Sequence, residues 1–152
     1  SRDKNVKLST KGRYSIRFML DLAVHYGKGP VLLREISERE GISEKYLWHL
    51  VNPLKSVGLI RTTRGAKGGF ELAKPPASIT VKEIFEVVEG PVCLVDCIDQ
   101  PATCERSSFC VARDLWADAS NALAGVLGNT TLANLVEKQD QKKKNQAVNY
   151  DI

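Results

Sequence analysis

Two short amphipathic segments on either side of Gly41 constrain the fold more than any other feature of the sequence. Residues 32–40 carry apolar side chains at helical spacing, and Gly41 can adopt the left-handed conformation that ends a helix. Ser43 can cap a second helix, in which Leu47 faces inward. Two short helices joined through a glycine are typical of a helix-turn-helix, and we predict one here.

A glycine-rich hairpin is predicted directly after the second helix. Residues 59–64 and 70–73 are strand-like runs, and the turn between them contains three glycines. In this position a hairpin is a wing, whose tip can lie along a DNA backbone, and Arg64 and Lys67 would supply positive charge there. The predicted fold class is therefore mainly α with a small β-hairpin, in the form of a winged helix-turn-helix domain.

The outward face of the second helix carries side chains suited to contact with bases. An exposed Trp48 beside His49 is unfavourable in water unless both contact a partner, and base edges require planar or hydrogen-bonding groups. Pro53 lacks an amide hydrogen and is expected to bend or tighten the end of this helix. The residues predicted to face outward are Ser43, Glu44, Lys45, Tyr46, Trp48, His49 and Asn52.

Charge is divided unevenly between the two halves of the chain. The 152 residues carry a net charge of +4. Residues 1–75 contain 15 Lys and Arg and 7 Asp and Glu, a net charge of +8, whereas residues 76–152 contain 7 Lys and Arg and 11 Asp and Glu, a net charge of −4. A basic half indicates contact with a polyanion. The sequence has no Ser-His-Asp set, and its only histidines are His25 and His49, so nothing in it supports an enzyme.

All four cysteines lie within eighteen residues of the acidic half. They follow the pattern C-x3-C-x6-C-x5-C, as Cys93, Cys97, Cys104 and Cys110. A disulfide framework suits secreted chains, but the N-terminal residues lack an apolar signal segment and no apolar run could span a membrane, so we expect a reducing, cytoplasmic setting. Zinc sites usually contain C-x2-C pairs, whereas iron-sulfur clusters tolerate wider spacing. The cysteine spacing therefore favours an iron-sulfur cluster, and a zinc site remains an alternative.

Helices are predicted on both sides of the cysteine loop. Thr80 and Glu83 form a capping box for a helix that ends at Glu89. A long helix starts near Ser108, and its apolar stripe is suited to packing against a second copy of the chain, because the core beside it is small. This stripe consists of Leu115, Ala119, Ala122, Leu123, Val126 and Leu127.

Three regions follow from these features. We predict a winged helix-turn-helix region at residues 1–75, a cluster-binding loop with a dimerisation helix at residues 76–136, and a flexible tail at residues 137–152. A short last helix ends at Val136. The tail is rich in Lys, Gln, Asn and Asp, and we expect it to bury too little apolar surface to become ordered.

The chain resembles the IscR and NsrR family of winged-helix regulators over roughly residues 6–136. The matching stretches are residues 7–14, 36–43, 46–47, 58–59, 64–65, 68–69 and 104–107. The resemblance implies a homodimer that binds a palindromic operator in double-stranded DNA and holds an iron-sulfur cluster, either [2Fe-2S] or [4Fe-4S]. It implies cluster ligands at Cys97, Cys104 and Cys110. It also implies a minor-groove arginine at Arg64 and recognition-helix contacts from Ser43, Lys45, Tyr46, Trp48 and His49.

Departures from the family's pattern leave the fourth ligand and the operator open. Arg113 stands where the IscR branch has a histidine ligand, and Arg13 stands where the NsrR branch has a carboxylate. Cys93 is the local candidate for the fourth ligand; otherwise it is a spare thiol and one iron keeps an exchangeable position. Trp48 and His49 stand where IscR has Glu and Gln, so we expect a different operator.

The predicted function is a homodimeric transcriptional repressor whose affinity for DNA changes with the state of its cluster. The signal would be redox state, iron-sulfur status or nitric oxide. One alternative keeps the fold and replaces the cluster by redox thiols or zinc. Another is a small electron-transfer protein, which would need the cluster but not the basic recognition surface.

Overall fold

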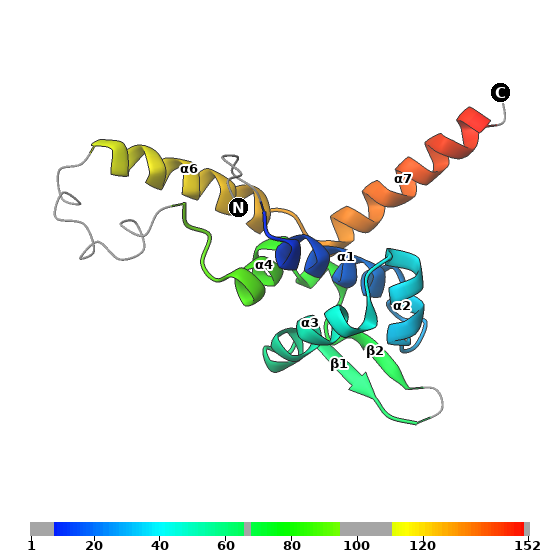
Figure 1. Ribbon diagram of the computed structural model, residues 1–152. Helices are drawn as coiled ribbons and strands as arrows, with labels where there is room; N and C mark the ends of the chain where they lie inside the picture. The colour runs from blue at the N-terminus through cyan, green and yellow to red at the C-terminus, as the bar shows by residue number, and fades with distance from the viewer. Residues whose placement is uncertain (1–7, 66–67, 95–110, 151–152) are drawn as a thin grey trace.

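The computed structural model describes residues 8–65, 68–94 and 111–150, which form helices and one antiparallel hairpin that projects from the helical body (Figure 1). In chain order the elements are α1 (Thr10–Val24), α2 (Leu33–Glu40), α3 (Glu44–Ser56), β1 (Ile60–Thr63), β2 (Gly69–Leu72), a 3-10 turn η1 (Pro76–Ser78), α4 (Val81–Glu89), α6 (Val111–Gly128) and α7 (Leu132–Tyr150). The predicted fold class, mainly α with a small β-hairpin, is confirmed.

Side-chain caps begin several of the helices, among them α1, α3 and α4. Ser9, Ser43 and Thr80 each accept a hydrogen bond from the backbone N–H three residues later, at 3.0, 3.1 and 3.1 Å respectively. Gly41 ends α2 in the left-handed conformation, with φ of 66°. The predicted starts of α3 and α4 and the predicted turn between α2 and α3 are therefore confirmed.

The third helix continues through Pro53 to Ser56 as one α-helix. Pro53 cannot donate a hydrogen bond to the carbonyl four residues before it. Leu50 and Leu54 on either side are nevertheless fully buried, and burial of two leucines outweighs one missing bond. The apolar face of α3 therefore continues past Pro53 to Leu54.

One hydrophobic core joins the N-terminal half to the C-terminal half. Figure 1 shows α1 in the middle, with α2, α3 and the hairpin on one side and with α6 and α7 leaving on the other. The start of α7 is fastened to the start of α4, because the Leu132 N–H donates to the Ile79 carbonyl at 2.9 Å. The largest fully buried side chains are Phe18, Met19, Leu22, Ile36, Leu47, Leu50, Leu54, Ile60, Leu72, Ile79, Ile84 and Leu132.

The last helix is longer than the sequence predicted. The prediction ends a short helix at Val136 and makes residues 137–152 a flexible tail, whereas α7 runs to Tyr150 and extends away from the body (Figure 1). Leu132 is fully buried and Leu135 packs against the core, which anchors the first turns. The residues that follow are rich in Lys and Gln, which favour helix even when fully solvated. The composition limits burial without preventing the helix, so the predicted helix end at Val136 is wrong. The flexibility predicted for residues 137–152 stays a prediction.

The wing is anchored by backbone hydrogen bonds to the loop before α2. Its strands pair in antiparallel register, with Thr63 opposite Gly69. Val31 and Phe70 exchange two N–H···O bonds, each 2.8 Å long. A Cβ at Gly69 would lie 2.4 Å from the Val31 carbonyl oxygen, so only glycine allows this approach.

The long helix α6 leaves much of its apolar surface uncovered in the single chain. Val111, Leu115 and Val126 are 80%, 58% and 65% exposed. Ser120, in the middle of the helix, is buried. Within the described residues, no helix combines the length and apolar character needed to cross a membrane.

Candidate nucleic-acid interface

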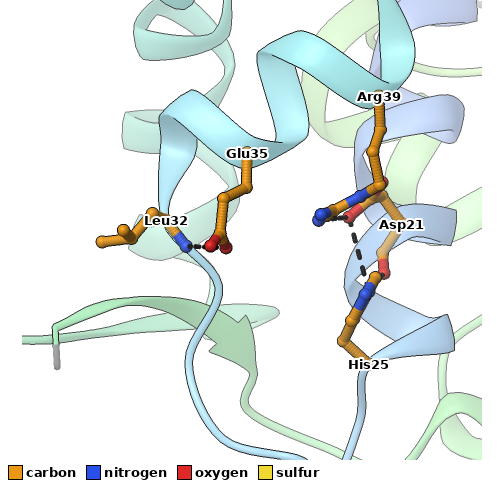
Figure 2. A network of polar contacts seen from close by, with 5 residues as sticks. All are labelled: Asp21, His25, Leu32, Glu35 and Arg39. Carbon is orange, nitrogen blue, oxygen red and sulfur yellow. Dashed lines mark hydrogen bonds and ion pairs between the residues drawn. The ribbon is translucent and has the colours of Figure 1, made fainter.

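An ion-pair network fixes α2 against α1 (Figure 2). The buried Asp21 carboxylate accepts two hydrogen bonds from Arg39, from Nη2 to Oδ1 at 2.8 Å and from Nε to Oδ2 at 3.0 Å. His25 Nδ1 lies 2.8 Å from the Asp21 carbonyl oxygen. At the other end of α2, the Leu32 N–H donates to Glu35 Oε2 at 3.3 Å. The bidentate pair sets the angle at which α2, and with it α3, leaves α1.

The same carboxylate affects two ionisable neighbours. Its hydrogen bond raises the pKa of Arg39 above the usual value, so this guanidinium stays charged. Burial, followed by the nearby Asp21, raises the pKa of Glu40, and Arg17 partly opposes this shift. Arg17 Nε lies 3.3 Å from Glu40 Oε1, and Nη2 donates to the Glu40 carbonyl oxygen. Arg17 therefore stabilises the joint between α1 and α2.

We expect Asp21→Asn to lower the free energy of unfolding by about 1.5 kcal/mol, because a neutral amide cannot accept the charge-assisted pair from Arg39. The Arg39 side chain is 39% exposed, and its access to water limits the loss. Chemical denaturation measures the change. Glu71→Gln is the control: it breaks an exposed pair with Arg61 and should change stability by less than about 1 kcal/mol. Equal losses in the two variants would contradict the role given to Asp21.

The exposed face of α3 carries most of the predicted DNA-contacting side chains. Lys45 and His49 are exposed, and Ser43 is exposed at the helix start. Trp48 is 54% exposed, and its ring meets the Phe70 ring edge to face, with centroids 5.6 Å apart. The indole therefore faces solvent on one side and is supported by the wing on the other.

Tyr46 differs from its predicted outward placement. It is half-buried and packs against the core, and its ring meets that of Tyr14 edge to face at 5.3 Å. This contact orients α3 on α1. A DNA contact from Tyr46 remains a prediction, and only its exposed part could make it.

The wing contributes one described basic residue from the predicted set. Arg64 is exposed just beyond β1, whereas Lys67 lies outside the described residues. The neighbouring Arg61 is held by Glu71 at 2.8 Å. Within the described part of the hairpin, Arg64 has no ion-pair partner, which leaves it available for DNA.

A hollow between α3 and β1 brings together residues that sequence reasoning did not include in the site. Lys55, Thr62 and Thr63 line it together with Arg64 and Trp48. A signal for Lys55 was present, because it follows Trp48 by seven residues and so lies on the same face of the helix. That this face lies beside β1 could be seen only in the tertiary structure.

The cysteine loop connects α4 to α6, and the structure describes its first residues. Cys93 is half-buried. Leu94 donates its N–H to the buried Ser120 Oγ of α6 at 3.0 Å. Outside the described residues lie Cys97, Cys104 and Cys110. Elsewhere in the part of the chain that the structure describes, no three Cys, His, Asp or Glu side chains are grouped to hold a metal.

Residues 8–138 match a family model described as "Rrf2: Iron-dependent Transcriptional regulator". The chain belongs to the Rrf2 family. Among its Rrf2 relatives, the HTH-type transcriptional regulator IscR of Serratia proteamaculans is 40% identical over 135 residues, which cover 89% of this chain and 82% of that protein. The resemblance stated from the sequence motifs is thus confirmed.

Solved Rrf2 structures are similar to this one over most of their length. IscR of T. potens has a TM-score of 0.76 and 36% identity, with 91% of each chain covered. CymR of B. subtilis, described as the global cysteine regulator, has a TM-score of 0.75 and 38% identity, covering 88% of this chain and 98% of that one. This Rrf2 chain is accordingly a DNA-binding transcriptional regulator of the helix-turn-helix type.

Proposed function

We propose that the protein is a homodimeric transcriptional repressor whose affinity for DNA depends on an iron-sulfur cluster. Cys97, Cys104 and Cys110 would hold the cluster, with Cys93 as the fourth thiolate. When bound, the cluster supplies a centre whose charge and ligands respond to oxidation, iron supply or nitric oxide. The observation that carries the proposal is the placement of four thiols in one loop between α4 and α6.

Two residues of α4, Phe85 and Glu89, contact the start of α1. Glu89 ends α4 four residues before Cys93 and accepts a hydrogen bond from the Ser9 hydroxyl, which caps α1. A Cβ at Gly12 would lie 3.2 Å from Glu89 Oε1 and 3.5 Å from the Phe85 ring, so α1 and α4 are in close contact there. A change in the loop would reach α1 through these residues.

We assign the uncovered apolar face of α6 to a second copy of the chain. Leu115 and Val126 are 58% and 65% exposed, and a helix this long with so much apolar surface in water is typical of a subunit interface. The bond from Leu94 to Ser120 attaches the cysteine loop to this same helix. The loop is thereby connected to both the DNA-binding half and the proposed dimer contact.

In a dimer, the two recognition helices must enter half-sites about 34 Å apart on one side of the duplex. A change in their spacing therefore weakens both contacts at once. A coupling of about 1–3 kcal/mol would change affinity by roughly 5- to 150-fold. Gel shifts with a selected operator, comparing cluster-loaded and cluster-free protein, measure this coupling. Equal affinities would refute the sensing role and leave DNA binding intact.

Iron and acid-labile sulfide analysis of protein purified without air tests the cofactor. We expect a coloured protein, and we expect Cys97→Ala, Cys104→Ala and Cys110→Ala each to lose most of the iron, because each variant removes a thiolate ligand. Cys93→Ala should lose iron as well. Full iron in the Cys93 variant would instead leave one iron with an exchangeable position.

A thiol-based regulator without a cluster is the second candidate, and the 38% identity to the B. subtilis cysteine regulator favours it. For this candidate, protein purified without air would be colourless and free of iron. Its DNA affinity would change on mild oxidation and return with a reductant. Colour together with acid-labile sulfide in the anaerobic protein excludes this candidate.

A further inference from the structure

We propose that the hollow between α3 and β1 binds a phosphate of the DNA backbone, with Lys55 as its principal contact and Asn52 and Thr63 as hydrogen-bond donors. The inference rests on the proposed function, because it requires duplex DNA lying on α3 and the wing. The hollow has a volume of about 290 Å³ and opens beside Trp48.

The hollow lies where the DNA backbone is expected when a winged helix binds a duplex. The recognition helix occupies the major groove, and a wing reaches the adjacent minor groove. One strand separates these two grooves, so its sugar-phosphate backbone must cross the junction of α3 with the hairpin. The hollow lies at this junction, between residues of α3 and residues of β1.

Charge distinguishes this hollow from the one on the other side of Trp48. Lys55 and Arg64 line it, and no acidic side chain among the described residues does. The opposite hollow contains Arg34 together with Glu44, so its charge is balanced. A phosphate is favoured only where positive charge is left unneutralised, which selects the side with Lys55.

The positively charged side chains of this hollow form no ion pairs within the described residues. Over the described ranges, neither Lys55 nor Arg64 has an ion-pair partner, in contrast to Arg61, which is bound to Glu71. Asn52 and Lys55 lie on the exposed face of α3, one turn apart. The hollow is thus lined by an ammonium, an amide and a hydroxyl group. All three can donate hydrogen bonds to phosphate oxygens.

Packing holds the walls of the hollow in place before DNA arrives. Trp48 on α3 is braced by Phe70, and Phe70 is bonded through its backbone to Val31. On the strand side, Thr63 is held in register opposite Gly69. The backbone on both sides of the hollow is therefore fixed before binding, so the loss of freedom on binding is confined to exposed side chains such as Lys55.

Salt-dependent binding to duplex DNA tests the proposal with the full chain and two probes: a duplex selected from a random library, and an unrelated duplex. For Lys55→Gln we expect about tenfold weaker binding to both probes, and a log–log salt slope that is smaller by about 0.9 for each subunit bound. Lys142→Gln on α7 removes the same charge far from α3 and should change neither quantity. His49→Ala should weaken binding to the selected duplex alone, because a base contact carries sequence information.

A methylphosphonate scan then locates the contact. One uncharged linkage at the strand between the two grooves should weaken binding by the wild-type protein and have no further effect on Lys55→Gln, because that contact is already lost. Wild-type affinity and salt slope in Lys55→Gln, or equal sensitivity of both proteins at every scanned linkage, would overturn the phosphate site. Failure of the wild-type protein to bind either duplex would instead overturn the proposed function.

Discussion

Replacing Leu50 with alanine is expected to lower the free energy of unfolding by about 2–5 kcal/mol. Leu50 is fully buried on the face of α3 that meets the core, so the truncated side chain leaves a cavity that its neighbours fill only in part. A loss of this size is a large fraction of the total stability of an ordinary domain, which is about 5–15 kcal/mol. Denaturant titration measures the loss, and DNA binding should fall with the folded fraction.

Two controls separate cavity formation from a general sensitivity of α3. Leu50→Met keeps the volume and should lose less than about 1.5 kcal/mol. Val57, at the end of α3, is 55% exposed, and Val57→Ala should change stability by no more than about 0.5 kcal/mol. If Leu50→Ala were no more destabilising than Val57→Ala, the core assigned to the recognition helix would be wrong.

Gly69→Ala is expected to lower the free energy of unfolding by about 3 kcal/mol, through backbone strain and loss of the hydrogen bonds that anchor the wing. The new methyl group would lie 2.4 Å from the Val31 carbonyl oxygen and 2.7 Å from its carbonyl carbon, and backbone atoms cannot rotate away. Separation of Val31 from Phe70 would also free the wing from the body. We therefore expect weaker DNA binding under conditions in which the variant is still folded.

Gly65→Ala is the matched control for Gly69→Ala within the same hairpin. Gly65 also has a positive φ, of 108°, but a Cβ there meets nothing within 4 Å. Its substitution carries the strain of the backbone conformation alone, about 1 kcal/mol. Equal effects of the two substitutions, in denaturation and in DNA affinity, would show that the contact between the wing and Val31 is unimportant.

Local signals made much of the fold predictable from the sequence. The caps at Ser43 and Thr80 and the turn at Gly41 each act through neighbouring backbone groups, so they can be recognised without knowing the tertiary structure. The same holds for the hairpin, whose predicted strands flank a turn with three glycines. The exposed Trp48 was also predictable, because no apolar period placed it in the core.

The features that were missed depend on contacts between distant residues. Tyr46 was predicted to face outward, but its ring is partly covered by Tyr14, which lies thirty-two positions earlier in the chain. The pair of Asp21 with Arg39 and the hollow beside Lys55 likewise require two elements to meet. The helix beyond Val136 was not predicted for another reason. Low apolar content indicates little burial, but the helix propensity of Lys and Gln does not depend on burial.

The cross-bracing of the DNA-binding half limits where regulation can act. Arg39 ties α2 to α1, Phe70 ties the wing to the loop before α2, and Trp48 ties α3 to the wing. A unit fastened at three joints moves as one rigid body, so a signal would change the distance between two such bodies and not the shape of either. Substitutions that uncouple sensing while preserving affinity for a single half-site should therefore be found in α4 and α6, outside this unit.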